Sequence, residues 1–201
     1  MESVKACWVT ASLLLLAANS LIAAQAPELS KEHRAELVLR LLPEEARPVA
    51  TIVLRDGSHD EHYRNGDGQF LCVSDASSAQ RLSMVCHHHV LEQRLRFERE
   101  LSRATGLQGE AFRERLCREI TARGWSVPDG AMEITASLAR TKDGSYAREM
   151  TVYHLLWLPH QTVESTGVVG KDPGNGRPFL HQAGTCGAHV MWSEVVAVSG
   201  A

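Results

Sequence analysis

Hydrophobic and polar positions follow two different spacings along the chain, which predicts both helices and strands. Residues 27–47 place apolar side chains at helical spacing, and Ser30 is positioned to cap this helix. The short β-branched run at 49–54 predicts a strand. The sequence Asn-Gly-Asp-Gly at 65–68 predicts a hairpin turn, so we expect residues 69–73 to form the returning strand.

The middle of the chain has a helical pattern, and the last third returns to strands. Apolar residues between 79 and 123 recur at helical spacing, with a break at Gly106. Arginine and glutamate interleave along this region, which is typical of a solvated, ion-paired helix face. Residues 132–138 and 150–158 flank a turn and predict a hairpin, and 188–198 predict a final strand.

These elements predict an α+β fold in which an antiparallel sheet packs against two or three helices. The sheet is expected to contain residues 49–73, 132–158 and the C-terminal strand, with the helices within 79–123. With 201 residues, of which 44% are hydrophobic and 22% charged, the chain has the size and composition of one globular domain. Its net charge of −3 argues against a nucleic-acid partner, because such proteins normally present a strongly basic face.

The N-terminal 24 residues have the pattern of an export signal. Lys5 is followed by an uncharged run over residues 6–24 that has four leucines at its centre and small residues at its end. This pattern predicts a signal peptide cleaved after Ala24, which leaves 25–201 as a single exported α+β domain. An uncleaved membrane anchor is the alternative, because the uncharged run approaches a spanning length. We therefore expect a periplasmic or extracellular protein that meets the membrane only during export.

Four cysteines remain after this cleavage, and their even number in an exported protein predicts disulfides. Three connectivities are possible. Cys72 and Cys86 lie on either side of a Ser/Asp-rich turn, and their pairing would stabilise the fold by about 3 kcal/mol through loop closure. By elimination, Cys117 would then pair with Cys186.

The histidine-rich segments do not match any complete metal-binding signature. Cys-His-His-His at 86–89 lies in the predicted helix, where successive side chains point 100° apart, so the three imidazoles would not meet at one ion. His-Asp-Glu-His at 59–62 is most simply a solvated turn, because it lacks the glycine of a calcium loop. The sequence therefore predicts neither a metal nor a cofactor.

Two further arrangements are candidates for catalysis. Cys186 and His189 have the spacing of a minimal thiolate–imidazole pair, a hypothesis that a disulfide at Cys186 would exclude. His89, Glu164 and His189 are candidates for an acid/base or metal constellation. They would meet at the mouth of the long glycine-rich segment 159–187, which predicts a loop of the kind that often forms a functional lid.

Several short motifs carry a resemblance to other proteins. The first group is Leu-Arg-Asp-Gly at 54–57, Gly-Gln-Phe-Leu-Cys at 68–72 and Cys86; the second is Glu-Ser-Thr-Gly at 164–167 and Gly-Ala-His-Val-Met-Trp at 187–192. Together they resemble a loose group of uncharacterised exported bacterial proteins. The resemblance implies a secreted single domain with a Cys72–Cys86 bridge, and it implies no activity. His89, Glu164 and His189 match polar positions of the group's pattern.

The sequence favours an exported domain that binds a small ligand or a partner, without specifying either. The first alternative is a metal-dependent or acid/base hydrolase that uses His89, Glu164 and His189. The second is an envelope protein held by its N-terminal segment. The enzyme hypothesis requires these polar side chains to meet in a concave pocket, whereas a binding domain does not.

Overall fold

A computed structural model describes residues 29–198, so the predicted signal peptide lies outside the described residues. The elements, in chain order, are α1 (Lys31–Leu39), η1 (Arg47–Val49), β1 (Thr51–Asp56), β2 (His59–Arg64), β3 (Phe70–Ser78), β4 (Arg81–His88), η2 (His89–Leu91), α2 (Glu92–Thr105), α3 (Gly109–Ala122), β5 (Met132–Ala139), β6 (Glu149–Trp157), α4 (Val163–Thr166), β7 (Phe179–His181) and β8 (His189–Ala197). The η elements are short 3-10 turns.

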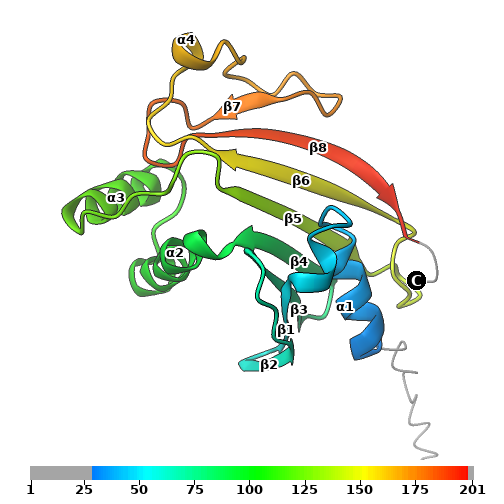
Figure 1. The fold of residues 1–201 in the computed structure, drawn as a ribbon. Helices are drawn as coiled ribbons and strands as arrows, with labels where there is room; N and C mark the ends of the chain where they lie inside the picture. Colours follow the sequence, from blue (N-terminus) through cyan, green and yellow to red (C-terminus); the bar gives the residue numbers. More distant parts are fainter. Residues whose placement is uncertain (1–28, 199–201) are drawn as a thin grey trace, which may run out of the picture.

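The strands form one curved, mixed sheet in the order β2-β1-β3-β4-β5-β6-β8-β7 (Figure 1). Adjacent strands are antiparallel except β1 and β3, which are parallel. The α+β prediction is thus confirmed in outline. The sheet is mostly rather than wholly antiparallel, and within the described residues four α-helices accompany it instead of the two or three expected.

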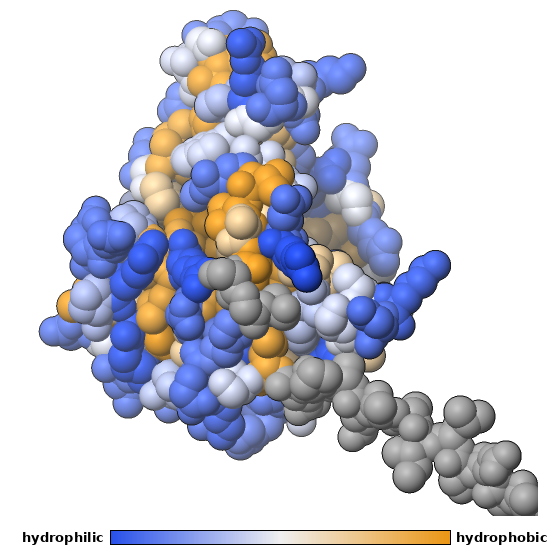
Figure 2. All heavy atoms as spheres, turned by 90° about the vertical axis from the view of Figure 1, so that its right-hand side faces the viewer, coloured by the Kyte–Doolittle hydropathy of each residue, from blue (hydrophilic) through white to orange (hydrophobic). Residues whose placement is uncertain are grey.

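Strand alternation gives the sheet two faces with different surroundings. On one face, Ile52, Met84 and Ile134 pack against α1, whose Leu37 and Val38 are completely buried. The helix α2 lies on the opposite side of the sheet, with α3 beside it (Figure 1). The main core therefore lies between the sheet and α1. Figure 2 views the molecule from the right-hand side of Figure 1 and shows hydrophobic side chains between hydrophilic ones on that surface.

The predicted hairpin turn is in the wrong place. β1 turns into β2 at Gly57, which has a left-handed φ of 62°, and β3 pairs with β1 in parallel on its other side. Gly66 and Gly68 belong to the crossover between β2 and β3. A Cβ at either position would collide with the backbone oxygen of Val49, so these glycines allow a close backbone approach rather than a hairpin.

The helical prediction is wrong for the residues before His89, where a short 3-10 turn begins. Arg81–His88 form β4, in which Leu82 and Met84 point into the core with period two. The seven-residue spacing between Met84 and Leu91 fits two helical turns, but Leu91 lies beyond the strand, in the 3-10 turn η2. The helices α2 and α3 follow, separated by Gly106 in its left-handed conformation, as expected.

The remaining structural predictions have mixed outcomes. The β5–β6 hairpin and the final strand are present, and Ser30 caps α1 by accepting a hydrogen bond from the backbone N–H of His33. The segment 159–187 is not wholly a loop, because it contains α4 and β7. The cluster at 59–62 is part of strand β2 rather than a turn.

Two disulfides cross-link the described residues. Cys72 and Cys86 are direct neighbours in β3 and β4, and Cys117 on α3 bonds to Cys186 before β8. These are the pairs that the sequence analysis favoured, and they indicate an oxidising environment. Among residues 29–198, no helix combines the length and apolarity needed to cross a membrane.

Buried Arg34 attaches α1 to the sheet. Its guanidinium donates to Asp56 Oδ1 at 2.8 Å and to the backbone oxygens of Arg55 and Ser74 at 2.9 and 2.8 Å. Only 7% of its side chain is exposed, compared with 52% for Asp56. The guanidinium therefore satisfies acceptors on both β1 and β3.

Substitution of this arginine should destabilise the fold. We expect Arg34→Met to lower the free energy of unfolding by about 2–4 kcal/mol, because two backbone carbonyls lose their charged donor. The control Lys31→Met, on the same helix, removes only an exposed ion pair with Glu61 and should change the free energy of unfolding far less than Arg34→Met. Urea unfolding followed by circular dichroism measures both, and equal effects would contradict the role assigned to Arg34.

Candidate functional site

A cavity of about 310 Å³ lies on the sheet face opposite α1, between β2 and α2. Its floor is aliphatic and comes from three adjacent strands and one helix: Val53, Leu71, Val73, Val85 and Leu95. The strand residues point to this face because they alternate with the core residues of the other face.

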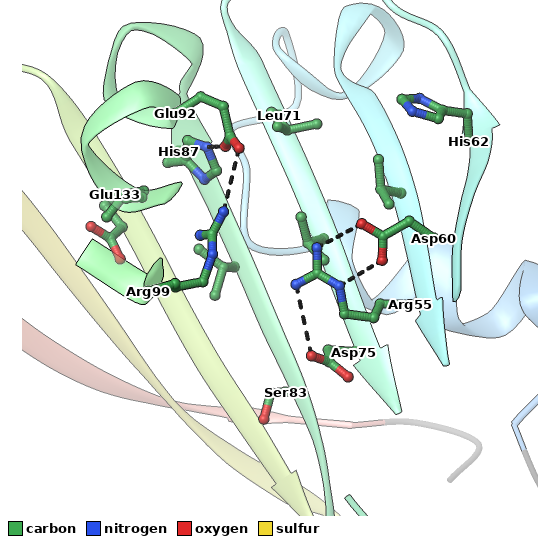
Figure 3. A pocket seen from close by; sticks show the side chains of 14 residues that line it. Arg55, Asp60, His62, Leu71, Asp75, Ser83, His87, Glu92, Arg99 and Glu133 are labelled. Atoms are coloured by element: carbon green, nitrogen blue, oxygen red, sulfur yellow. Dashed lines mark hydrogen bonds and ion pairs between the residues drawn. The ribbon is translucent and has the colours of Figure 1, made fainter. Parts of the chain in front are cut away.

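Two polar groups lie on either side of this floor (Figure 3). On the α2 side, His87 Nε2 is 2.9 Å from Glu92 Oε2, and Arg99 donates to the other oxygen of Glu92 at 3.4 Å. On the β2 side, Arg55 makes a two-pronged hydrogen bond with Asp60 at 2.6 and 2.8 Å.

Hydrogen bonds stabilise the ionised carboxylate in each of the two groups. The hydrogen bond with His87 lowers the pKa of Glu92, and the hydrogen bond with Arg55 lowers the pKa of Asp60. Burial has the opposite effect on Glu133, whose pKa is raised. Both rims thus hold ionised carboxylates, whereas the inner wall holds a carboxyl that takes up a proton more readily.

The inner wall contains an unsatisfied nitrogen. His87 is the direct partner of Glu133 across β4 and β5, and only 2% of it is exposed. Its Nδ1 is buried without a hydrogen-bond partner among the described residues. Buried polar atoms in native proteins nearly always have a partner, so this nitrogen is an exception within the wall of the cavity.

Buried Arg94 holds α2 in place behind the cavity. Its guanidinium carbon lies 4.3 Å from the ring centroid of Trp157, and Nη1 donates to the backbone oxygen of Cys186 at 3.0 Å. Trp157 Nε1 donates to Glu133 at 3.3 Å. These contacts connect α2 to β6, to the wall of the cavity and to the segment before β8.

The three candidate residues from the sequence do not lie in this cavity. His89 is exposed after β4, with its Nδ1 3.3 Å from the backbone oxygen of Gln69. Glu164 is exposed in the first turn of α4, where its hydrogen bonds to backbone and to Thr162 lower its pKa. His189 is buried, and no hydrogen bond or ion pair joins any two of the three.

Other expectations concern metals and the cysteine nucleophile. In the region 29–198, no three histidine, cysteine, aspartate or glutamate side chains are grouped closely enough to hold a metal ion. The proposed nucleophile Cys186 is bonded to Cys117, so the thiolate hypothesis is wrong. This disulfide borders another cavity, of about 590 Å³, which His160 and His181 also line.

Sequence reasoning missed the main cavity because its residues were assigned to other elements. His87 belonged to a predicted helix, and Asp60 and His62 belonged to a predicted turn. The alternation of Leu82, Met84 and Cys86 with smaller or polar residues was the signal for a strand, and it would have placed His87 on the opposite face from the core.

Comparisons with known proteins found no matching family model, no matching curated protein and no matching solved structure. The resemblance to exported bacterial proteins therefore stays a prediction. The interpretation of the cavity rests on its own chemistry.

His189 should make stability depend on pH. Burial lowers its pKa from 6.5 to about 4, with a smaller contribution from the nearby charges of His181 and Arg94. The unfolded chain takes up a proton near pH 6.5 and the folded chain only near pH 4, so stability present above pH 6.5 is lost as the pH falls toward 4.

The variant His189→Asn removes this titration and keeps a side-chain donor for the backbone oxygen of Gly187. As the pH falls from 6.5 to 4, the wild type should lose about 3 kcal/mol more of its free energy of unfolding than this variant loses. The control His160→Asn replaces an exposed histidine with a left-handed φ of 65°, which asparagine tolerates, and should behave as the wild type. Urea titrations at several pH values provide the test; parallel curves for His189→Asn and the wild type would show the assignment to be wrong.

Proposed function

We propose that this protein is an exported binding domain, periplasmic or extracellular, whose ligand is a small molecule with an apolar body held between β2 and α2. The observation that carries the proposal is the aliphatic floor enclosed by polar groups in a cavity of about 310 Å³. Small-molecule pockets are typically roughly 300–1,000 Å³, mainly apolar, with a few polar groups that orient the ligand.

The floor is rigid, which supports a binding role. Leu71 and Val73 flank Cys72 on β3, and Val85 precedes Cys86 on β4. The disulfide between these cysteines lies on the core side of the same two strands. Because the floor is already fixed, little conformational entropy is lost when a ligand binds.

The proposal includes export of the protein from the cytoplasm. Two disulfides and the export-signal pattern of the N-terminal segment support secretion into an oxidising space. In such a space, a domain with an open apolar cavity can take up a small molecule directly from its surroundings.

A tryptophan in the floor should prevent binding. Decanol supplies a ten-carbon chain without charge, and we expect Val73→Trp to weaken its binding by at least about tenfold because the indole occupies the cavity. The control Val195→Trp places the same side chain on the same sheet face, at a residue of β8 that is 67% exposed and outside the cavity lining. Isothermal titration calorimetry measures both, and unchanged decanol binding by Val73→Trp would refute the proposed site.

An acid–base hydrolase is a second candidate, favoured by the contact of His87 with Glu92 inside the cavity. In this role the imidazole would take a proton from water as the water attacks an ester carbonyl, and would give it to the departing alcohol when the ester C–O bond breaks. p-Nitrophenyl decanoate tests it. A hydrolase releases p-nitrophenol at a rate that His87→Gln reduces by about 100-fold or more, whereas equal rates for both proteins would exclude this candidate.

A further inference from the structure

We infer that the ligand of this cavity is an anionic amphiphile, whose carboxylate or phosphate group is bound by arginines at the cavity mouth. The inference rests on the proposed function and specifies the chemical class of its ligand. It is carried by a second hollow that opens from the first.

The second hollow, of about 590 Å³, is the continuation of the cavity toward solvent. Four residues line both hollows, namely Arg55, Asp60, Glu92 and Arg99. The second hollow is also lined by Gly57 and Ser58 in the β1–β2 turn and by three residues of α2, which are Arg96, Glu100 and Arg103. A ligand with its chain on the aliphatic floor would therefore extend its other end between this turn and α2.

The arginines of α2 line one side of this mouth because of their spacing. Arg96, Arg99 and Arg103 are three and four residues apart, so they share one face of the helix. All three are exposed. Arg55 approaches from the floor, and the mouth therefore contains four arginines against the three carboxylates of Asp60, Glu92 and Glu100.

Two of these carboxylates are already engaged. Asp60 bonds to Arg55, and Glu92 is shared between His87 and Arg99. Arg96 and Arg103 form no ion pair with any carboxylate of the described residues. Two guanidinium groups at the mouth thus have free donors, and guanidinium matches the two-oxygen geometry of carboxylate and phosphate.

The inner end of the cavity offers no competing site for a cation. Glu133 is the carboxyl there, and burial raises its pKa while Trp157 donates a hydrogen bond to it. Asp75, at the other side of the floor, is 3.9 Å from Arg55. The carboxylates that line the first cavity therefore face cationic or hydrogen-bonding partners. At the mouth, the groups without an ion pair among the described residues are Arg96, Arg103 and the single carboxylate of Glu100, so the excess charge there is positive.

The test uses amphiphiles with one ten-carbon chain and different head groups. Calorimetry on the mature protein is expected to show that decanoate, decyl phosphate or both bind about tenfold or more tightly than decanol, and that decylammonium binds more weakly than decanol. The affinity for the anion should fall as salt is added, because the mouth is exposed to solvent. The relative affinities of decanoate and decyl phosphate decide which head group the mouth prefers.

The double variant Arg96→Gln/Arg103→Gln tests the contribution of the arginines at the mouth. It should weaken binding of the anion about tenfold and leave decanol binding unchanged. The control Arg115→Gln/Arg118→Gln removes the same charge from exposed positions of α3 and should leave both affinities unchanged.

The possible results distinguish failure of the anionic ligand class from failure of the proposed binding function. If decylammonium binds as tightly as decanoate and decyl phosphate, or if the anions bind equally well to the mouth variant, the anionic class is overturned. Decanol binding that Val73→Trp abolishes would still support the cavity in that case. If no amphiphile binds, the proposed function itself fails.

Discussion

The position of α2 depends on a charge buried beneath it. Arg94 stacks on Trp157 of β6 and donates to the backbone oxygen of Cys186, and only 6% of the residue is exposed. A buried guanidinium is stable only with such partners, because removal of its hydration is otherwise costly. This requirement limits α2 to the position in which Arg94 reaches both partners, and in that position Leu95 and Arg99 form one wall of the cavity.

The partners of Arg94 are themselves fixed by covalent and steric constraints. Cys186 is bonded to Cys117, so the segment that accepts the hydrogen bond is tied to α3. Gly187 follows directly, and a Cβ there would collide with the side chain of Gln182 and approach Arg94. The disulfide, the glycine and the guanidinium therefore act at one place, where α2, α3, β6 and the start of β8 meet.

The sequence predicts the parts of this structure that depend on local signals. Ser30 as a helix cap, Gly106 as a helix end and the β5–β6 hairpin depend on nearby residues, and they are present. The parallel pairing of β1 with β3 and the contact of Arg94 with Cys186 depend on residues far apart, the latter separated by 92 positions. Helical and strand periodicities describe only neighbouring residues and do not predict these contacts. The cavity that depends on them was therefore not predictable from the sequence.

Contacts between distant residues also decide which charges along the helices form ion pairs. Interleaved arginine and glutamate predicted ion-paired surfaces, and α3 agrees, because Glu119 pairs with Arg115 and Arg123. On α2, however, Glu92 turns toward His87 on β4, a residue that the sequence placed in a helix. This tertiary contact removes a carboxylate from the helix surface, and Arg96 and Arg103 remain without an ion pair among the described residues. A helix face that resembles a neutral one in the sequence thus becomes a rim with an excess of positive charge, because Glu92, four residues before Arg96, is engaged by His87 of the neighbouring strand and by Arg99.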